Sequence, residues 1–95
     1  MPLETTPWDP AEHLTTPEAQ IAYLEAVLDD GDPKVIASAL GAIARARGMS
    51  KVAREAGVTR PALYKALSED GDPRLSTLLG VVKALGLKLT FERAA

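Results

Sequence analysis

Apolar residues recur at helical spacing along most of the chain, and turn residues divide this recurrence into five segments. In the first segment Ile21, Leu24, Val27 and Leu28 lie three or four residues apart, as expected for one face of a helix. The other segments show the same spacing. The pattern therefore predicts an all-α domain with five helices, at about 17–29, 33–47, 50–56, 60–68 and 75–85.

Residues with known helix-capping preferences stand at the ends of these segments. Thr15, Thr16, Pro17 and Glu18 predict a capping box with proline in the first turn. Asp32 precedes Pro33 at the start of the second segment, and Ser50 and Thr59 are the expected caps of the two short helices. Glycines close four of the helices, which fits the left-handed backbone that often ends a helix; they are Gly31, Gly48, Gly57 and Gly86.

The two ends of the chain depart from the helical pattern. Residues 1–14 contain three prolines and predict an irregular, acidic arm that precedes one domain over residues 15–95. Near the other end, Leu87, Leu89 and Phe91 alternate with polar residues, which predicts a short strand over 87–92. Because one strand cannot pair with itself, we expect it to pair with its copy across a dimer or with the N-terminal segment.

The segment from Met49 to Leu67 carries the most specific signal. Its two short predicted helices flank Gly57, where a tight turn needs an unusual backbone angle. Ala53 is small where the two helices would cross, and apolar residues recur on their facing sides. This is the pattern of a helix-turn-helix over 49–67, although an ordinary helical hairpin has similar spacing. The residues expected to point inward are Val52, Ala53, Ala56, Val58, Leu63, Ala66 and Leu67.

The outward side of the second helix favours DNA. It carries no acidic residue between Arg60 and Lys65. An arginine in the first turn can reach guanine with its two-pronged side chain, and a tyrosine one turn later can contact a base or a phosphate. Expected base contacts are Arg60, Pro61, Tyr64 and Lys65, and expected backbone contacts are Ser50, Lys51, Thr59, Ser68 and Arg74.

Composition narrows the class of protein. The chain has 95 residues, 46% hydrophobic but only 4% aromatic, so Ala, Leu, Val and Ile must build the core of one small domain. It has no cysteine, which excludes disulfides and thiolate metal sites and suits the cytoplasm. We expect neither a signal peptide nor a membrane span, because no apolar run approaches the roughly 20 residues needed to cross a bilayer.

Charge is divided unevenly along the chain. Residues 1–33 hold eight acidic residues and no Lys or Arg, whereas residues 34–95 hold all eleven basic residues and five acidic ones. This asymmetry predicts an anionic partner for the basic body and a cationic partner for the acidic segment, in which Trp8, Leu14 and Tyr23 are candidate anchors. The alternatives are that the acidic segment only maintains solubility and that the aromatic rings pack on the protein's own helices.

The amino-acid sequence resembles those of the addiction-module antidote proteins, which are small HigA-like antitoxins with a Cro/C1-type helix-turn-helix. The resemblance covers nearly the whole chain and is closest over ARARGMSKVAREAGVTRPALYKALSEDGDP, residues 44–73. It implies operator binding as a homodimer, autorepression of the operon and neutralisation of a small basic RelE/ParE-like, that is HigB-like, toxin. It also implies recognition-helix roles for Thr59, Arg60, Pro61, Tyr64 and Lys65. Pro61 departs from the polar residue common at that position, so readout depends more on Arg60 and Tyr64.

Other functions are less well supported by the residues. We expect no enzyme activity and no cofactor, because the chain lacks a nucleophile–base set and its one histidine, His13, lies in the arm. We also expect no metal site, because the acidic residues of 69–72 lack the spacing of a calcium-binding loop. A stand-alone prophage-type repressor would use the same DNA-reading module. A helical protein-interaction module that never contacts DNA is a third alternative, and it predicts an activity that does not depend on Arg60 or Lys65.

Overall fold

The computed structural model describes residues 13–95, and these form five helices. The helices are α1 (Pro17–Asp30), α2 (Pro33–Arg47), α3 (Met49–Ala56), α4 (Arg60–Ala66) and α5 (Leu75–Ala84). The predicted all-helical fold is confirmed, and the expected ends are within about two residues of those observed. No described helix is long and apolar enough to span a membrane.

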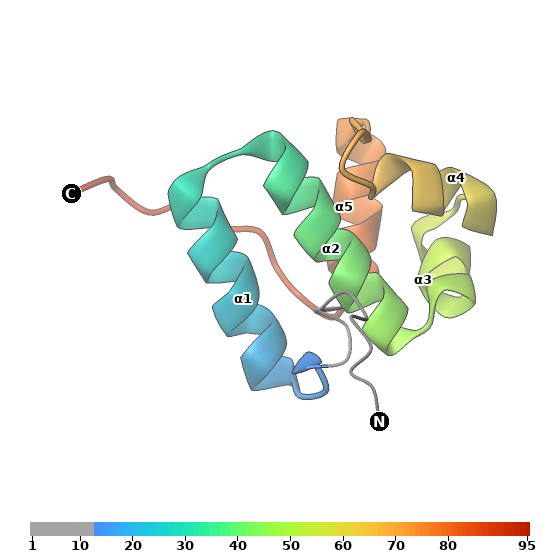
Figure 1. Cartoon of the computed structure of the whole chain (residues 1–95), viewed down its shortest axis with the longest axis horizontal. Helices are drawn as coiled ribbons and strands as arrows, with labels where there is room; N and C mark the ends of the chain where they lie inside the picture. The colour runs from blue at the N-terminus through green and yellow to red at the C-terminus, as the bar shows by residue number, and fades with distance from the viewer. Residues whose placement is uncertain (1–12) are drawn as a thin grey trace, which may run out of the picture.

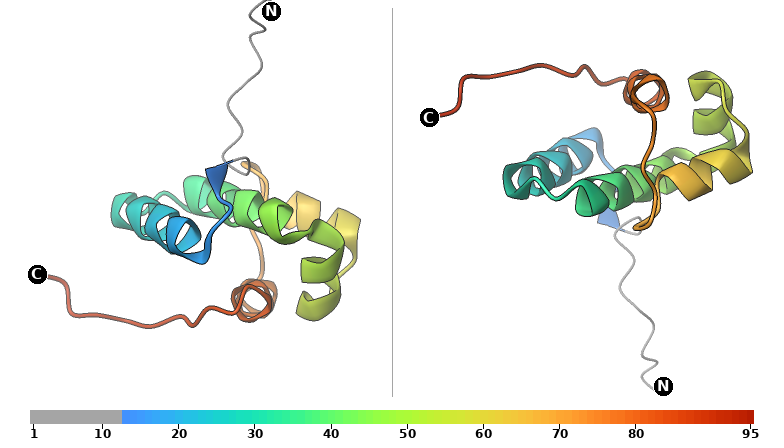
Figure 2. Two further views of the ribbon diagram at one scale, coloured as in Figure 1. Left: turned by 90° about the horizontal axis from the view of Figure 1, so that it is seen from below. Right: turned by 90° about the horizontal axis from the view of Figure 1, so that it is seen from above.

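The helices are arranged in two layers. In Figure 1, α1 lies alongside α2, and α3 and α4 lie beyond the other side of α2. Figure 2 shows α1, α2 and α4 in one layer, with α5 and the C-terminal segment to one side of it. Helix α3 packs extensively against α5 and connects the two layers.

Helix α2 is the centre of the packing. The residues from Ala39 to Ala44 are all buried, and four of these six are the small residues Ala or Gly. At Gly41 the backbone carbonyl of Leu67 comes so close that even a methyl group would collide with it. The core that surrounds α2 is completed by Val52 and Ala53 from α3, Leu63 from α4, and Val81 from α5.

The helix N-caps agree with the sequence predictions, except at the starts of α1 and α3. The Asp32 side chain accepts a hydrogen bond from the Lys34 amide at 3.0 Å, as expected for an N-cap. Helix α1 is capped by Thr16, whose hydroxyl accepts from the Ala19 amide, so Glu18 is one position short of a capping box with Thr16. Ser50 does not cap α3, because only Gly48 separates α2 from α3 and the helix already begins at Met49.

The expected strand over 87–92 is absent, because the described residues 13–95 contain no other strand with which it could pair. Leu87 packs on the core, but Leu89 is 45% exposed and Phe91 is 93% exposed. The segment extends from α5 past α1, as Figure 2 shows, and at its start the amide of Leu87 donates to the carbonyl oxygen of Val82 at 3.0 Å.

A polar contact joins the N-terminal segment to the core. The Gln20 side chain is only 4% exposed. Its amide nitrogen donates to the carbonyl oxygen of Leu14 at 2.9 Å, and its amide oxygen accepts from Nε of Arg47 at 2.9 Å. Through these hydrogen bonds, Gln20 connects α1 to residue 14 and to the last turn of α2.

We expect Gln20→Leu to lower the free energy of unfolding by about 1–3 kcal/mol, because it leaves a buried carbonyl and a guanidinium group without their partner. Urea unfolding measures the change. Glu25→Gln, on the exposed side in the middle of α1, is the control and should change the value by less than about 0.5 kcal/mol. Equal stability of the two variants would contradict a structural role for Gln20.

Candidate nucleic-acid interface

Helices α3 and α4 form a compact pair joined by a tight turn. Gly57 ends α3 in the left-handed conformation, with φ 78° and ψ 26°, as its position in the sequence predicted. The amide of Val58 then donates to the carbonyl oxygen of Ala53 at 3.0 Å, which turns the chain sharply. The side chains of Val52, Ala53, Leu63 and Leu67 are buried, and those of Ala56, Val58 and Ala66 are partly buried.

The side of α4 that faces away from the core is basic. Leu63 is fully buried, whereas Arg60, Pro61, Tyr64 and Lys65 are exposed. We call these four exposed residues the α4 face. Because none of them is acidic, the α4 face presents two positive charges and an aromatic ring to solvent.

Arg60 and Tyr64 are held together on this surface. The Nη2 atom of Arg60 donates to the Tyr64 hydroxyl at 3.3 Å, and the guanidinium carbon lies 5.3 Å from the centre of the tyrosine ring. Residues four apart on a helix are neighbours, so the sequence spacing dictates this pairing. The guanidinium has five N–H donors, so most of them are left for another ligand. The pair therefore limits the conformations of Arg60 before any ligand arrives.

Thr59 is the N-cap of α4. Its hydroxyl oxygen accepts a hydrogen bond from the Ala62 amide at 3.2 Å, which fixes the side chain at the start of the helix. A hydroxyl can accept and donate at once, so its proton remains able to reach a phosphate oxygen.

Ser68 is placed differently from the other expected backbone contacts. Its hydroxyl donates to the carbonyl oxygen of Lys65 at 2.9 Å and so uses its single proton within the protein. Ser68 could donate to a phosphate only if it gave up this hydrogen bond. The exposed residues Ser50, Lys51 and Arg74 have no such restriction in the geometry described.

Arg74 approaches α4 from the loop that follows it. Arg74 and Lys65 line the same shallow depression, which also contains the carboxylates of Asp70 and Asp72. These two acids lower the positive potential there relative to the α4 face. Arg74 therefore lies in a less positive environment than Arg60.

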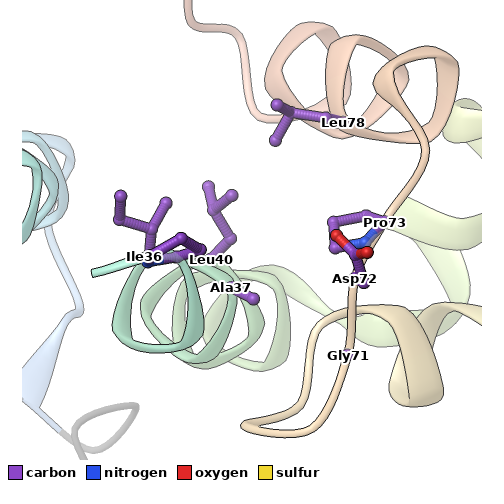
Figure 3. Close-up of a pocket in the computed structure, with 8 residues that line it drawn as sticks. Ile36, Ala37, Leu40, Gly71, Asp72, Pro73 and Leu78 are labelled. Atoms are coloured by element: carbon purple, nitrogen blue, oxygen red, sulfur yellow. The ribbon is translucent and has the colours of Figure 1, made fainter. Parts of the chain in front are cut away.

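A second depression is apolar. Ile36, Ala37 and Leu40 of α2 face Leu78 of α5 across it, and residues 71–73 close one end (Figure 3). Asp72 is the one titratable residue among those that line it. The depression therefore contains no pair of groups for acid–base chemistry. In addition, no group of three or more potential ligands within residues 13–95 is placed to hold a metal ion.

The three expected toxin anchors have different surroundings. Trp8 lies outside the described residues. Leu14 is 5% exposed and belongs to the core, and Tyr23 is partly buried against that core. In their present positions Leu14 stabilises the fold and Tyr23 offers only part of its ring to a partner.

The sequence pattern missed two exposed hydrophobic side chains on α1. It placed Ile21 and Leu28 on the buried stripe, but they are 42% and 52% exposed. Leu24 and Val27, the other two residues of that stripe, are partly buried as predicted, and Gln20 and Tyr23 also face inward. No local signal in the sequence separates these two residues from Leu24 and Val27, because all four lie on one apolar face of the helix.

Comparisons with known proteins cover nearly all of the described structure. A family model described as "Probable addiction module antidote protein" matches residues 4–93. A protein of Haemophilus influenzae that is described only as uncharacterized is 47% identical over 87 residues, which cover 92% of this chain and 90% of that protein. No solved structure matches the chain.

Proposed function

The chain belongs to the family of probable addiction module antidote proteins, and on that premise we propose that it is a HigA-like antitoxin that also represses its own operon. In this proposal it neutralises a small basic RelE/ParE-like, or HigB-like, toxin and binds operator DNA as a homodimer. It acts by binding in the cytoplasm and catalyses no reaction. Family membership supports the toxin partner, and the exposed, acid-free α4 face is the observation that supports DNA binding.

We assign α3 and α4 to a Cro/C1-type helix-turn-helix in which α4 is the recognition helix. Such a helix lies in the major groove and contacts base edges mainly with its N-terminal residues. Arg60 is in the first turn of α4, where its guanidinium can donate to N7 and O6 of guanine. Tyr64 positions that guanidinium and Lys65 contacts a phosphate. Pro61 lacks an amide proton and contributes only apolar contact.

The same docking brings polar groups on either side of the turn to the DNA backbone. Thr59 presents its hydroxyl beside the recognition helix, and the exposed Ser50 and Lys51 lie in the first turn of α3. Arg74 would extend the contact beyond α4, and Ser68 would take part only by accepting hydrogen bonds or by rearranging. These contacts fix orientation, whereas Arg60 and Tyr64 carry sequence preference.

We place the homodimer interface on α5 and the C-terminal segment. Leu75 and Leu79 lie one turn apart on α5 and are 67% and 45% exposed. The extended residues 87–92 lack a strand partner within the described chain, and an antiparallel copy would supply one. A symmetric dimer would present two recognition helices to two half-sites, which one short helix needs for tight specific binding.

The antitoxin role is tested by growth rescue. We would induce a small basic reading frame adjacent to this gene alone and then together with this chain. We expect growth arrest in the first case, relief in the second, and copurification of the two proteins. Absence of arrest, or arrest without relief, would contradict the antitoxin role and favour a stand-alone prophage-type repressor.

The DNA-binding role is tested with the DNA directly upstream of the gene. We expect Arg60→Ala to weaken binding about 5- to 150-fold for each half-site of the dimer, the equivalent of ~1–3 kcal/mol for one bidentate base contact. Lys65→Ala should weaken binding to all sequences and reduce the slope of log affinity against log salt by about 2, that is about 1 for each protomer. Fluorescence anisotropy at several salt concentrations gives both values.

Lys34→Ala is the control for these two variants, because it removes the same charge from the exposed first turn of α2. It should leave sequence-specific binding within about 3-fold of wild type, as expected of a surface change that removes no contact. DNA binding that is indifferent to Arg60, Lys65 and salt would identify a protein-interaction module instead.

The dimer interface is tested by sedimentation velocity. We expect wild type to be a dimer at ~100 μM, well above the dissociation constants of specific interfaces, and Leu79→Asp to be a monomer. Leu28→Asp is the matched control, since Leu28 is exposed to a similar degree but lies on α1. A wild-type monomer at that concentration, or dissociation by Leu28→Asp alone, would contradict this interface.

A further inference from the structure

The outer side of α1 has two parallel stripes of unlike chemistry. Ile21 and Leu28 lie two turns apart and are about half exposed. Beside them, Glu18, Glu25 and Asp29 are exposed at helical spacing. We call these five residues the α1 face. Among the helices, α2 makes the extensive contact with α1, and it covers the opposite side.

This surface is held rigidly, although it is covered by no other helix. Thr16 caps the start of α1, and Gly31 ends it with a left-handed residue whose amide donates to the carbonyl oxygen of Val27. On the inner side, Gln20 is bonded to both Leu14 and Arg47. A partner that docks on the α1 face therefore meets a helix that is already ordered, so little conformational entropy is lost on binding.

The charges around the α1 face favour a cationic protein partner. Residues 1–33 contain no Lys or Arg, so no positive side chain on α1 offsets its carboxylates. A second copy docked face to face would bring like charges together. A second copy docked through its α5 side, which carries the basic residues Arg74 and Lys83, would make a head-to-tail contact, which builds rings or filaments and not the two-fold dimer proposed above.

Resting on the antitoxin role proposed above, we infer that the α1 face is the surface that holds the toxin. The apolar stripe of Ile21 and Leu28 forms the centre of this contact, and the carboxylates of Glu25 and Asp29 pair with basic groups of the toxin at its rim. These residues replace Leu14, which is in the core, and Tyr23, which is partly buried, as the main anchors.

The position of the α1 face has a consequence for DNA binding. Helix α2 separates α1 from α3 and α4, as Figure 1 shows. A toxin on the α1 face therefore leaves Arg60 and Tyr64 uncovered. Variants that lose the toxin contact should still bind operator DNA, and this retained activity reports that they are folded.

The test measures binding of the full chain to the purified product of the flanking reading frame by isothermal titration calorimetry. We expect Ile21→Ala/Leu28→Ala to weaken binding at least about 30-fold, as for residues at the centre of an interface. Glu25→Lys/Asp29→Lys should also weaken binding at least about 30-fold, because it brings lysines against the basic groups of the toxin at the rim. Operator affinity and the urea midpoint should stay at wild-type values.

Two controls isolate the surface. Glu55→Lys/Glu69→Lys makes the same change in net charge at exposed sites outside α1 and should leave toxin affinity within about 3-fold. Trp8→Ala tests the N-terminal arm as the alternative anchor. Loss of toxin binding in Trp8→Ala together with wild-type affinity in both α1 variants would overturn the inference in favour of the arm.

The remaining outcomes distinguish failure of this inference from failure of the antitoxin role. If wild type rescues growth and both α1 variants bind the toxin within about 3-fold of wild type, this inference is wrong while the antitoxin role stands. A change in oligomeric state in the α1 variants would assign the α1 face to a second copy and also overturn it. If wild type neither rescues growth nor binds the toxin, the proposed function and this surface both fail.

Discussion

Six consecutive buried residues, Ala39 to Ala44, mean that α2 is enclosed on every side, and the positions of the other helices follow from this. A helix so enclosed can be approached closely only where its side chains are small. Gly41 admits the backbone that follows α4, because any larger residue would collide with the Leu67 carbonyl. The α3–α4 pair is thereby fixed against α2 by backbone contact as well as by side-chain packing.

The enclosure of α2 also separates the two charged regions of the molecule. Helix α1 covers one side of α2, while α3 and α4 lie beyond the other (Figure 1). The uneven charge seen along the sequence thus becomes a separation in space, with carboxylates on α1 and an acid-free surface on α4. Opposite charges on separate surfaces can attract unlike partners without competing for one site. This arrangement underlies the proposal of one protein that binds both a basic toxin and DNA.

Much of the fold could be predicted from sequence because the helix ends carry explicit local signals. Asp32-Pro33 and Gly57 have conformational preferences that act over a few residues, and the structure follows them. The α4 face could be predicted for the same reason, since the burial of Leu63 and Leu67 determines which residues of a short helix face outward.

The environments that sequence failed to predict depend on contacts distant in the chain. Gln20 is buried because Arg47, 27 residues away, and a backbone carbonyl satisfy its amide group. Ile21 and Leu28 are exposed because α2 packs on the side of α1 that carries Gln20, Tyr23 and Val27. No local preference encodes either fact. The pairing of Arg60 with Tyr64, by contrast, was implicit in their spacing of four residues.

The large hydrophobic side chains that remain outside the core can be understood from the size of the domain. A chain of 95 residues has a high ratio of surface to volume, and a core rich in alanine buries little apolar area per residue. Leucines on both α1 and α5 are left at the surface, as is Phe91. Burying them against other molecules would stabilise the protein by about 25 cal/mol for each Å² of apolar surface removed from water. A domain built in this way gains stability from its partners, so occupation of its binding surfaces and persistence of its fold are thermodynamically linked.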